Sequence, residues 1–316
     1  VSTRRSSLRS KTIFHNLIGE MIDIFATFVF WSKWIYVRLV SQMPKRVAIQ
    51  GFCGCFHEEA ARLFYKDEPI SIVECPTFSD LYERLQAGSA DAITMAIENT
   101  ISGGLLPNFE LLRKWGKRIK GEVYLRIVQN LMALPGQKVE DLREVRTHYM
   151  AINQTREFFK SYPDIALVES EDTALSAAQV ARERLQGVGA VASRLAADLY
   201  GLEILQSSIE TYKQNFTRFL ILDDALQVPR EEIDKATLCF TLPHKPGALS
   251  SVLTILSFYD MNLTRIQSLP IPGREWQYFF YADIKFESYD RYLQAIAAAR
   301  PLMEDLDILG EYKSML

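Results

Sequence analysis

Residues 47–65, VAIQGFCGCFHEEAARLFY, contain the first complete strand–loop–helix unit of this 316-residue chain. Val47 to Gln50 is a short apolar run of the kind that forms a buried strand, and Glu58 to Tyr65 has the spacing of an amphipathic helix. The loop between them, Gly51 to His57, is rich in glycine and opens the helix. A short apolar strand followed by an amphipathic helix indicates an α/β fold with a largely parallel sheet.

The same alternation continues along the chain as far as Leu222. Strands are expected at 71–73, 92–97, 144–147, 165–168, 189–192 and 216–222, and helices at 79–87, 105–115, 150–162, 173–185 and 193–200. The polar stretch from Asp223 to Lys235 contains Pro229 and is expected to be a linker. The pattern after it changes to the order βαββαβ, which is typical of a ferredoxin-like domain. We therefore predict one domain at 46–222 and a second at 236–316.

Residues 1–43 do not share this pattern. Arg4 to Lys11 is basic and rich in serine, and Ile22 to Trp31 is strongly apolar. A membrane span needs about 20 apolar residues, and charged residues at 20, 23 and 33 interrupt any such window here. We expect residues 1–43 to be an extension outside the fold, with Met43 as a candidate start of the protein, and we expect no association with a membrane.

Composition excludes several classes of function. Lysine and arginine total 36 against 39 acidic residues, so there is no basic excess that would favour nucleic acid. The four cysteines fit neither a disulfide framework nor the spacing of a zinc site, and reduced thiols in a cytoplasmic protein without a metal are expected.

Polar residues gather where the expected strands end. Ligands of open parallel sheets bind beyond the carboxyl ends of the strands, where helices begin. Three groups occupy such places: Gly51 to His57, Glu98 to Gly104, and Thr147-His148 with Gln154 in the next helix. A fourth group, Asn215 to Phe219, places a hydroxyl and a guanidinium in an otherwise apolar strand. Polar groups at the end of a buried strand are costly unless they find partners. These groups are therefore the candidate binding site.

The four groups resemble, in the same order, motifs of the prephenate dehydratase family. The family carries a glycine-rich loop, an Ile-Glu-Asn-Ser/Thr motif, a Ser-His…Gln segment and a Thr-Arg-Phe motif. The small domain is similar to a regulatory amino-acid-binding (ACT) domain, which has a Gly-Ala-Leu motif and a Glu-Ser-Arg-Pro motif. The corresponding residues here are Gly51 to His57, Ile97-Glu98-Asn99-Thr100, Thr147-His148…Gln154, Thr217-Arg218-Phe219, Pro246-Gly247-Ala248-Leu249 and Ile266-Gln267-Ser268-Leu269-Pro270.

The resemblance implies a two-lobed catalytic domain, similar to a periplasmic binding protein, followed by the ACT domain. It also implies conversion of prephenate to phenylpyruvate in phenylalanine biosynthesis, without a metal or cofactor. The catalytic residues it implies are Thr217, Glu98, Asn99 and Gln154, and the substrate-binding residues are Arg218, Thr147, His148, Phe219, Gly54 and Cys55.

Several of these roles have alternatives. The Thr217 hydroxyl is too weak an acid to act alone and is expected to donate a hydrogen bond to the departing hydroxyl. Arg218 could bind a substrate carboxylate in a bidentate manner, or it could be a structural ion-pair partner. Glu98 could act in catalysis or only support its loop, and His148 could position the substrate or act as an acid.

Regulation by phenylalanine is also expected from the resemblance. The effector would bind Gly247, Ala248, Leu249, Gln267 and Ser268 at an interface between two small domains, which requires a homodimer or homotetramer. The second motif has Gln267 in place of Glu and Leu269 in place of Arg, so the loss of regulation is the alternative.

Two other functions compete with this interpretation. Arogenate dehydratase carries out the same chemistry on the aminated substrate, and no residue of the sequence separates the two enzymes. A non-catalytic solute-binding or amino-acid-sensing protein would share the two-lobed fold. Turnover of prephenate and of arogenate distinguishes all three.

Overall fold

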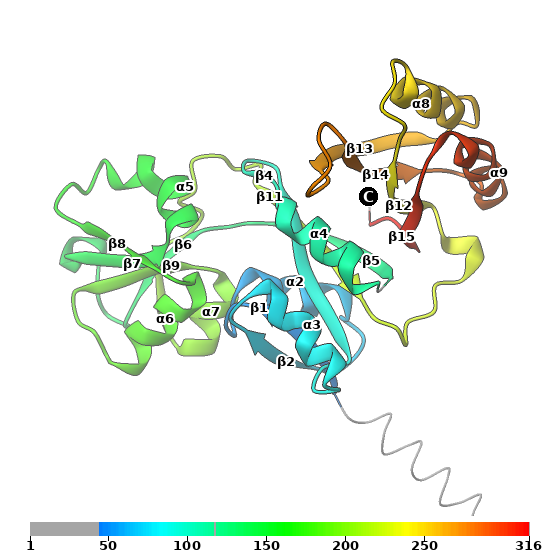
Figure 1. Cartoon of the computed structure of the whole chain (residues 1–316). Helices are drawn as coiled ribbons and strands as arrows, with labels where there is room; N and C mark the ends of the chain where they lie inside the picture. Colours follow the sequence, from blue (N-terminus) through cyan, green and yellow to red (C-terminus); the bar gives the residue numbers. More distant parts are fainter. Residues whose placement is uncertain (1–43, 117, 316) are drawn as a thin grey trace, which may run out of the picture. The chain divides into compact units, whose positions relative to one another are not determined.

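The computed structural model describes residues 44–116 and 118–315 (Figure 1). The interpretation of residues 1–43 as an extension lies outside the described residues. Within the described part, no helix combines the length and the apolar character that a membrane span requires.

The first lobe is a mainly parallel sheet covered by helices. Strand β1 pairs in parallel with β2 and β3, and the later strand β11 inserts antiparallel between β3 and β5. The prediction that 216–222 forms a strand is thus confirmed, and this strand returns to the first lobe from far along the chain. The elements are β1 (Lys45–Gln50), α2 (Phe56–Phe64), β2 (Ile70–Cys75), α3 (Phe78–Gln86), β3 (Ala92–Asn99), β4 (Gly103–Gly104), α4 (Leu106–Trp115), β5 (Ile119–Arg126) and β11 (Phe216–Leu222).

The second lobe is a five-stranded sheet in the order β10-β6-β9-β7-β8. The neighbouring strands β9, β7 and β8 are parallel, and each follows or precedes a helix as the alternating pattern predicts. Ser193 accepts a hydrogen bond from the Ala196 N–H at 3.0 Å and so caps α7 as expected. The elements are β6 (Asn130–Ala133), β7 (Glu144–His148), α5 (Tyr149–Phe159), β8 (Ala166–Ser170), α6 (Thr173–Arg182), β9 (Val188–Ala192), α7 (Arg194–Tyr200) and β10 (Glu203–Gln206).

One apolar core joins the two lobes. Val47 and Ile49 of β1 belong to the same buried cluster as Ala174 and Ala177 of α6. The side chains of α6 and α7 in this cluster are mostly alanine, which lets these helices approach the first lobe closely. The lobes are therefore in fixed contact along one side, and the candidate site residues lie at their boundary.

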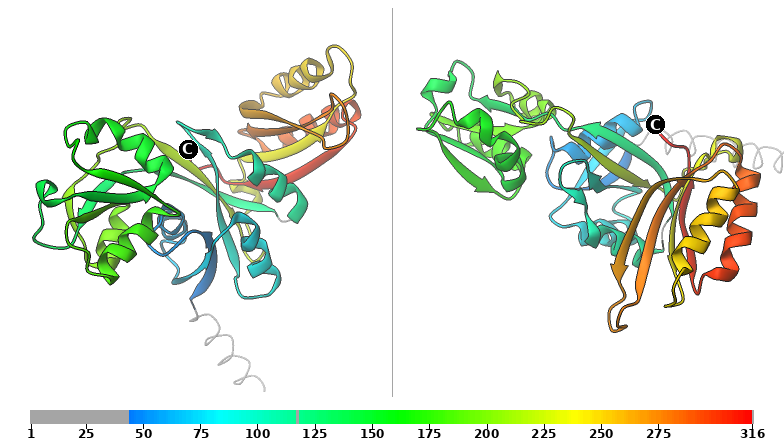
Figure 2. Two further views of the ribbon diagram at one scale, coloured as in Figure 1. Left: turned by 60° about the vertical axis from the view of Figure 1, so that its left-hand side comes forward. Right: turned by 90° about the horizontal axis from the view of Figure 1, so that it is seen from above.

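The C-terminal residues form the expected βαββαβ unit. Its sheet has the order β13-β14-β12-β15 with antiparallel neighbours, and α8 and α9 cover one face of it (Figure 2). A buried cluster that includes Leu238, Val252 and Tyr292 fills the space between helices and sheet. The elements are β12 (Lys235–Thr241), α8 (Ala248–Phe258), β13 (Asn262–Pro270), β14 (Tyr278–Lys285), α9 (Tyr289–Ala299) and β15 (Leu306–Tyr312).

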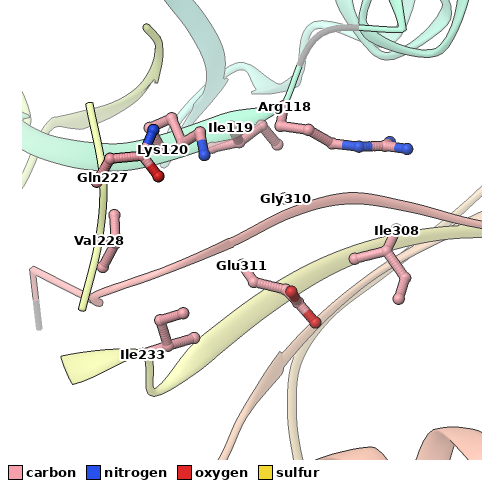
Figure 3. Close-up of a pocket in the computed structure, with 9 residues that line it drawn as sticks. All are labelled: Arg118, Ile119, Lys120, Gln227, Val228, Ile233, Ile308, Gly310 and Glu311. Atoms are coloured by element: carbon pink, nitrogen blue, oxygen red, sulfur yellow. The ribbon is translucent and has the colours of Figure 1, made fainter. Parts of the chain in front are cut away.

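The sheets of the first lobe and of the C-terminal unit are continuous through β5 and β15. These strands pair only at Ile119 and Gly310. A Cβ atom at Gly310 would lie 2.9 Å from the Cα of Ile119, so only glycine permits this approach. Beside the contact is a cavity of about 250 Å³ between Lys120 on β5, Glu311 on β15 and the linker residues Gln227 and Val228 (Figure 3). None of the predicted site residues lines it.

Candidate active site

The larger cavity, of about 530 Å³, lies between the two lobes and is called the interlobe cavity here. The first lobe supplies the ends of β1, β3 and β11 and the start of α2, while the second lobe supplies the starts of α5 and α6. Of the predicted site residues, the cavity brings together Thr217, Asn99, Gln154, His148, Phe219 and Cys55.

Strand register explains which side chains reach the cavity. Thr217 and Phe219 are two residues apart on β11 and therefore face the same side of the sheet. Their partners on β3 are Asn99 and Ala96, which are three residues apart because the register shifts between them. This irregularity brings all four residues to the cavity wall.

Arg218 lies between Thr217 and Phe219 on β11, so its side chain points to the opposite face of the sheet, away from the cavity. Its Nε donates to Glu122 at 2.7 Å, its Nη1 donates to Asp283 of β14, and its Nη2 donates to the Tyr312 hydroxyl at 2.8 Å. Burial alone would lower the pKa of this guanidinium, but the charges of Asp283 and Glu122 outweigh that effect and raise it. All three donor nitrogens are engaged on the side of the C-terminal unit. In this structure Arg218 therefore lies outside the interlobe cavity and takes part in a buried ion-pair network, which supports the ion-pair alternative over contact with a substrate carboxylate.

The position of Glu98 also differs from the prediction, because Glu98 too lies on the far face of the sheet. It pairs with Arg218 across the strands and thus lies on the same far side of the sheet, outside the cavity lining. Its carboxylate is 3.6 Å from the Arg265 guanidinium of β13. Glu98 and Thr217 therefore do not face the same cavity, whereas the neighbouring Asn99 does.

Two further predicted contacts also lie outside the cavity. The Thr147 hydroxyl donates to the Val191 carbonyl at 2.7 Å and so links β7 to β9 inside the second lobe. Gly54 has φ +90°, and a Cβ atom there would lie 2.9 Å from the Cα of Ala196 in α7. Gly54 thus permits the two lobes to approach each other and does not line the cavity.

A chain of side-chain amides connects the two lobes at the cavity. The Oδ1 of Asn99 accepts hydrogen bonds from the backbone N–H groups of Ile101 and Ser102, both at 2.9 Å. Backbone N–H groups can only donate, so the Asn99 amide has one orientation. Its Nδ2 must therefore be the donor to Asn215 Oδ1 at 2.7 Å and to Thr217 Oγ1 at 3.0 Å.

The same reasoning fixes the orientation of the other side-chain amides in this series of hydrogen bonds. Because Asn215 accepts at Oδ1, its Nδ2 donates to Gln154 Oε1 at 3.1 Å. Gln154 Oε1 also accepts from Gln129 Nε2 at 3.0 Å. The Gln129 Oε1 is then left as a buried acceptor without a partner among the described residues. Within this series of hydrogen bonds, two groups can still donate to a bound molecule: the amide Nε2 of Gln154 and the hydroxyl of Thr217.

Thr217 has the properties of a positioned donor. Its oxygen accepts from Asn99, which leaves the hydroxyl hydrogen free to point at a bound molecule. The residue is 8% exposed, in a wall that also contains the Phe219 ring. A hydrogen bond given in such a low-dielectric setting is stronger than one given in water.

The two histidines of the cavity are neutral. The Nδ1 of His148 accepts from the Met150 N–H at 3.3 Å, and burial lowers the pKa of its imidazole. The Nε2 of His57 accepts from the Ala96 N–H at 3.3 Å, and burial lowers the pKa of His57 to about 3. His148 therefore presents a neutral Nε2–H donor, which suits positioning better than proton transfer. Burial also raises the pKa of the Cys55 thiol, so a reactive thiolate is not formed there.

Gln129 and Asp172 belong to the site but were not among the predicted residues, and Asn215, which lay in the fourth candidate group, had no assigned role. Gln129-Asn130 interrupts an apolar run, as Glu98-Asn99 does, and that signal could have identified Gln129. Asp172 caps α6 at a strand-to-helix junction and lines the cavity. Sequence periodicity did not predict β5 and β6, so the segment that carries Gln129 had no assigned place.

Comparisons with known proteins agree with this architecture. The sequence model described as "Prephenate dehydratase" matches residues 47–226. An Arabidopsis thaliana protein described as arogenate dehydratase/prephenate dehydratase 2, chloroplastic, is 33% identical over 84% of this chain and 72% of its own length. The crystal structure of prephenate dehydratase from Arthrobacter aurescens in complex with L-Phe has a TM-score of 0.74 at 28% identity, covering 85% of this chain and 89% of that one.

One similar structure carries a different description. It is named GqqA, a novel type of quorum quenching acylase, and has a TM-score of 0.77 at 30% identity over 85% of this chain and 98% of its own. The family match covers more than half of the chain and coincides with both lobes of the interlobe cavity. The chain therefore belongs to the prephenate dehydratase family of carbon–oxygen lyases.

Proposed function

We propose that this protein converts prephenate to phenylpyruvate, carbon dioxide and water, with arogenate as the alternative substrate of the same chemistry. The observation that carries the proposal is the Thr217 hydroxyl, whose oxygen is held by Asn99 so that its hydrogen faces the interlobe cavity. In the reaction the bond to the ring carboxylate breaks and its electron pair enters the ring. The C–O bond to the ring hydroxyl breaks at the same time, and the departing hydroxide takes up a proton to leave as water.

Thr217 assists the departure by donating to the leaving oxygen as negative charge develops on it. Hydrogen-bond donors aimed at developing charge are the main source of stabilisation in such sites. Gln154 donates from its free Nε2 and can hold a second group of the substrate. The start of α5 lines the cavity, and the positive end of this helix favours a carboxylate of the substrate. The ring can pack against the Phe219 side chain.

The direct test is incubation of purified protein with prephenate. Phenylpyruvate formation, followed by its ultraviolet absorbance, is expected at a rate well above the uncatalysed one. Absence of turnover with both prephenate and arogenate would refute the proposal. A solute-binding role without catalysis would give that result together with measurable binding.

We also propose that the C-terminal unit, with boundaries near 236–316, is an ACT domain that binds phenylalanine. Gly247 has φ +80° and directly precedes α8, so the first turn of this helix, with Ala248 and Leu249, offers N–H groups to a carboxylate. Gln267 and Ser268 lie on β13, which is the edge strand of its sheet. The prephenate dehydratase of Arthrobacter aurescens was crystallised in complex with L-Phe, which supports the choice of effector.

An unpaired edge strand is a common site for pairing with another chain. Two large apolar side chains of the C-terminal unit, Phe258 and Trp276, are 78% and 72% exposed, as expected of surfaces covered by a partner. These features support a homodimer or homotetramer. Calorimetric titration with phenylalanine and sedimentation of the same sample test both parts. No binding and no inhibition at millimolar phenylalanine would show that the sensor has been lost. Location in the cytoplasm also stays a prediction.

A further inference from the structure

The charge of the interlobe cavity is unusual for a site that must hold a dianion. Among the described residues that line it there is no lysine and no arginine, whereas Glu171 and Asp172 both contribute carboxylates. The imidazoles of His57 and His148 are neutral because burial lowers the pKa of each. The side chains of the cavity therefore offer negative charge and no positive charge.

The two guanidiniums behind the wall do not change this balance. Arg218 is paired with Glu122 and Asp283 on the far side of the sheet. Arg265 lies against the back of Gly104, and its Nη1 is 3.6 Å from the Glu98 carboxylate. Arg218 is thus neutralised by two carboxylates outside the cavity, and Arg265 faces one carboxylate there, that of Glu98.

Asp172 is the carboxylate that is best placed to meet a ligand. Its Oδ1 accepts from the Leu175 N–H at 2.9 Å and caps α6, which fixes the side chain at the start of that helix. Its Oδ2 lies 3.0 Å from where a Cβ atom of Gly51 would be, so it reaches across to the loop of the opposite lobe. Burial raises the pKa of Asp172, and a carboxylate that is short of water gains most from a cationic partner.

Gln129 gives independent support for a ligand that donates hydrogen bonds. Its side chain lines the cavity and the residue is 3% exposed. The amide chain from Asn99 fixes its orientation, and its Oε1 has no partner among the described residues. A buried acceptor without a partner is destabilising unless a ligand or water supplies a donor.

Prephenate and arogenate differ at one group only. Both have two carboxylates and a ring hydroxyl, but the side chain of prephenate ends in a keto acid and that of arogenate in an amino acid. The keto oxygen only accepts hydrogen bonds, and prephenate carries two negative charges with none to offset them. The ammonium of arogenate donates three hydrogen bonds and halves the net charge.

From the carboxylate of Asp172 and the free acceptor of Gln129 we infer that the interlobe cavity selects the aminated substrate, arogenate, and that Asp172 is the specificity-determining residue that pairs with its ammonium. The inference rests on the proposed dehydratase function and makes arogenate, its alternative substrate, the preferred one. It assigns the choice between arogenate and prephenate to Asp172, which lies outside the family motifs that contain Asn99 and Thr217.

The test compares kcat/KM for arogenate and for prephenate in three proteins: the wild type, Asp172→Asn and Glu169→Gln. Asparagine caps a helix as well as aspartate does, so Asp172→Asn removes the charge and keeps the cap. Glu169→Gln removes a charge three residues away, from a β8 residue that does not line the cavity but whose charge partly offsets the lowering of the pKa of His148 by burial. It therefore controls for a general change of charge near the cavity. The wild type is expected to favour arogenate by at least about tenfold, because a charge-assisted hydrogen bond is about twice as strong as a neutral one.

In Asp172→Asn the ratio of the two kcat/KM values is expected to fall by at least about tenfold, while Glu169→Gln keeps the wild-type ratio. A purely structural role for Asp172 would lower both values together and leave the ratio unchanged, which would overturn the inference. A wild-type enzyme that prefers prephenate would also overturn it, and the proposed dehydratase function would then stand. If neither substrate is converted, the proposed function itself fails.

Discussion

Thr217 and Arg218 are adjacent in β11 but serve opposite faces of one sheet. The Thr217 hydroxyl faces the interlobe cavity, and the Arg218 guanidinium is buried against Asp283 and Tyr312 of the C-terminal unit. The strand therefore connects the reactive side of the first lobe directly to the C-terminal unit. A shift of Asp283 relative to β11 would act on the backbone that positions the Thr217 donor.

Replacement of the Thr217 hydroxyl tests its role in the reaction. Thr217→Ala is expected to lower kcat by about 10²-fold or more, the usual scale for losing a positioned transition-state donor. Thr217→Ser should keep part of the activity, because a serine hydroxyl can also accept from Asn99 and donate into the cavity. Steady-state kinetics with the preferred substrate give the comparison. Wild-type rates in a folded Thr217→Ala protein would remove this residue from the mechanism.

Arg218 is expected to matter for stability. Arg218→Met would leave the carboxylates of Glu122 and Asp283 buried with fewer partners, and breaking a buried pair in this way costs about 3–5 kcal/mol. The exposed pair Arg230–Asp290 supplies the control, since Arg230→Met should change stability little. Chemical denaturation of both variants measures the difference. Equal stabilities would contradict a structural role for Arg218.

The alternation of side chains along a strand separates what the sequence could predict from what it could not. The Thr-Arg-Phe motif located β11 correctly, and a period of two places Thr217 and Phe219 on one face. Which face borders the cavity depends on pairing with β3 and β5, and β5 was not predicted. Its sequence, IKGEVYLR, includes a glycine and buries Glu122, whose charge is met by two residues distant in sequence, Arg218 and Lys235.

The sequence also could not predict the roles of residues that act through contacts between the two lobes. A glycine-rich loop before a helix indicates an anion site, and this led to Gly54 as a substrate contact. The structure instead uses Gly54 to accommodate Ala196 of the second lobe, which no local pattern indicates. Asn99, in contrast, was found because polar groups at the end of a core strand need partners, and Gln154 was found through the family resemblance. The two side chains meet through Asn215.

The close approach of Gly54 to Ala196 across the lobe boundary can be tested by substitution. Gly54→Ala is expected to destabilise the protein and to lower activity, because its Cβ atom would lie 2.9 Å from the Ala196 Cα across the lobe boundary. Gly201 is the matched control: it also has positive φ, at +65°, but nothing lies within 4 Å of its Cβ position. Gly201→Ala should therefore show only the backbone strain of about 1 kcal/mol. Thermal unfolding and kcat/KM of both variants decide whether lobe contact is the cause.

The stability of the protein is expected to depend on pH through His57. This imidazole lies between the rings of Phe78 and Phe219, and burial lowers its pKa from 6.5 to about 3 in the folded protein. Between these two values the unfolded chain binds a proton that the folded protein does not. Stability from this group therefore falls as pH is lowered from 6.5 towards 3, by up to about 1.4 kcal/mol per pH unit.

Replacement by glutamine, which does not titrate, should remove this part of the slope. Denaturation of wild type and His57→Gln at pH 7 and pH 5 is expected to show a smaller loss of unfolding free energy in the variant, even if the variant is less stable at pH 7. His244 is exposed in the loop before α8 and provides the control, because His244→Gln should keep the wild-type slope. Parallel pH profiles for the wild type and His57→Gln would show that His57 is not held neutral by burial, since a histidine with an ordinary environment contributes no difference between the two states.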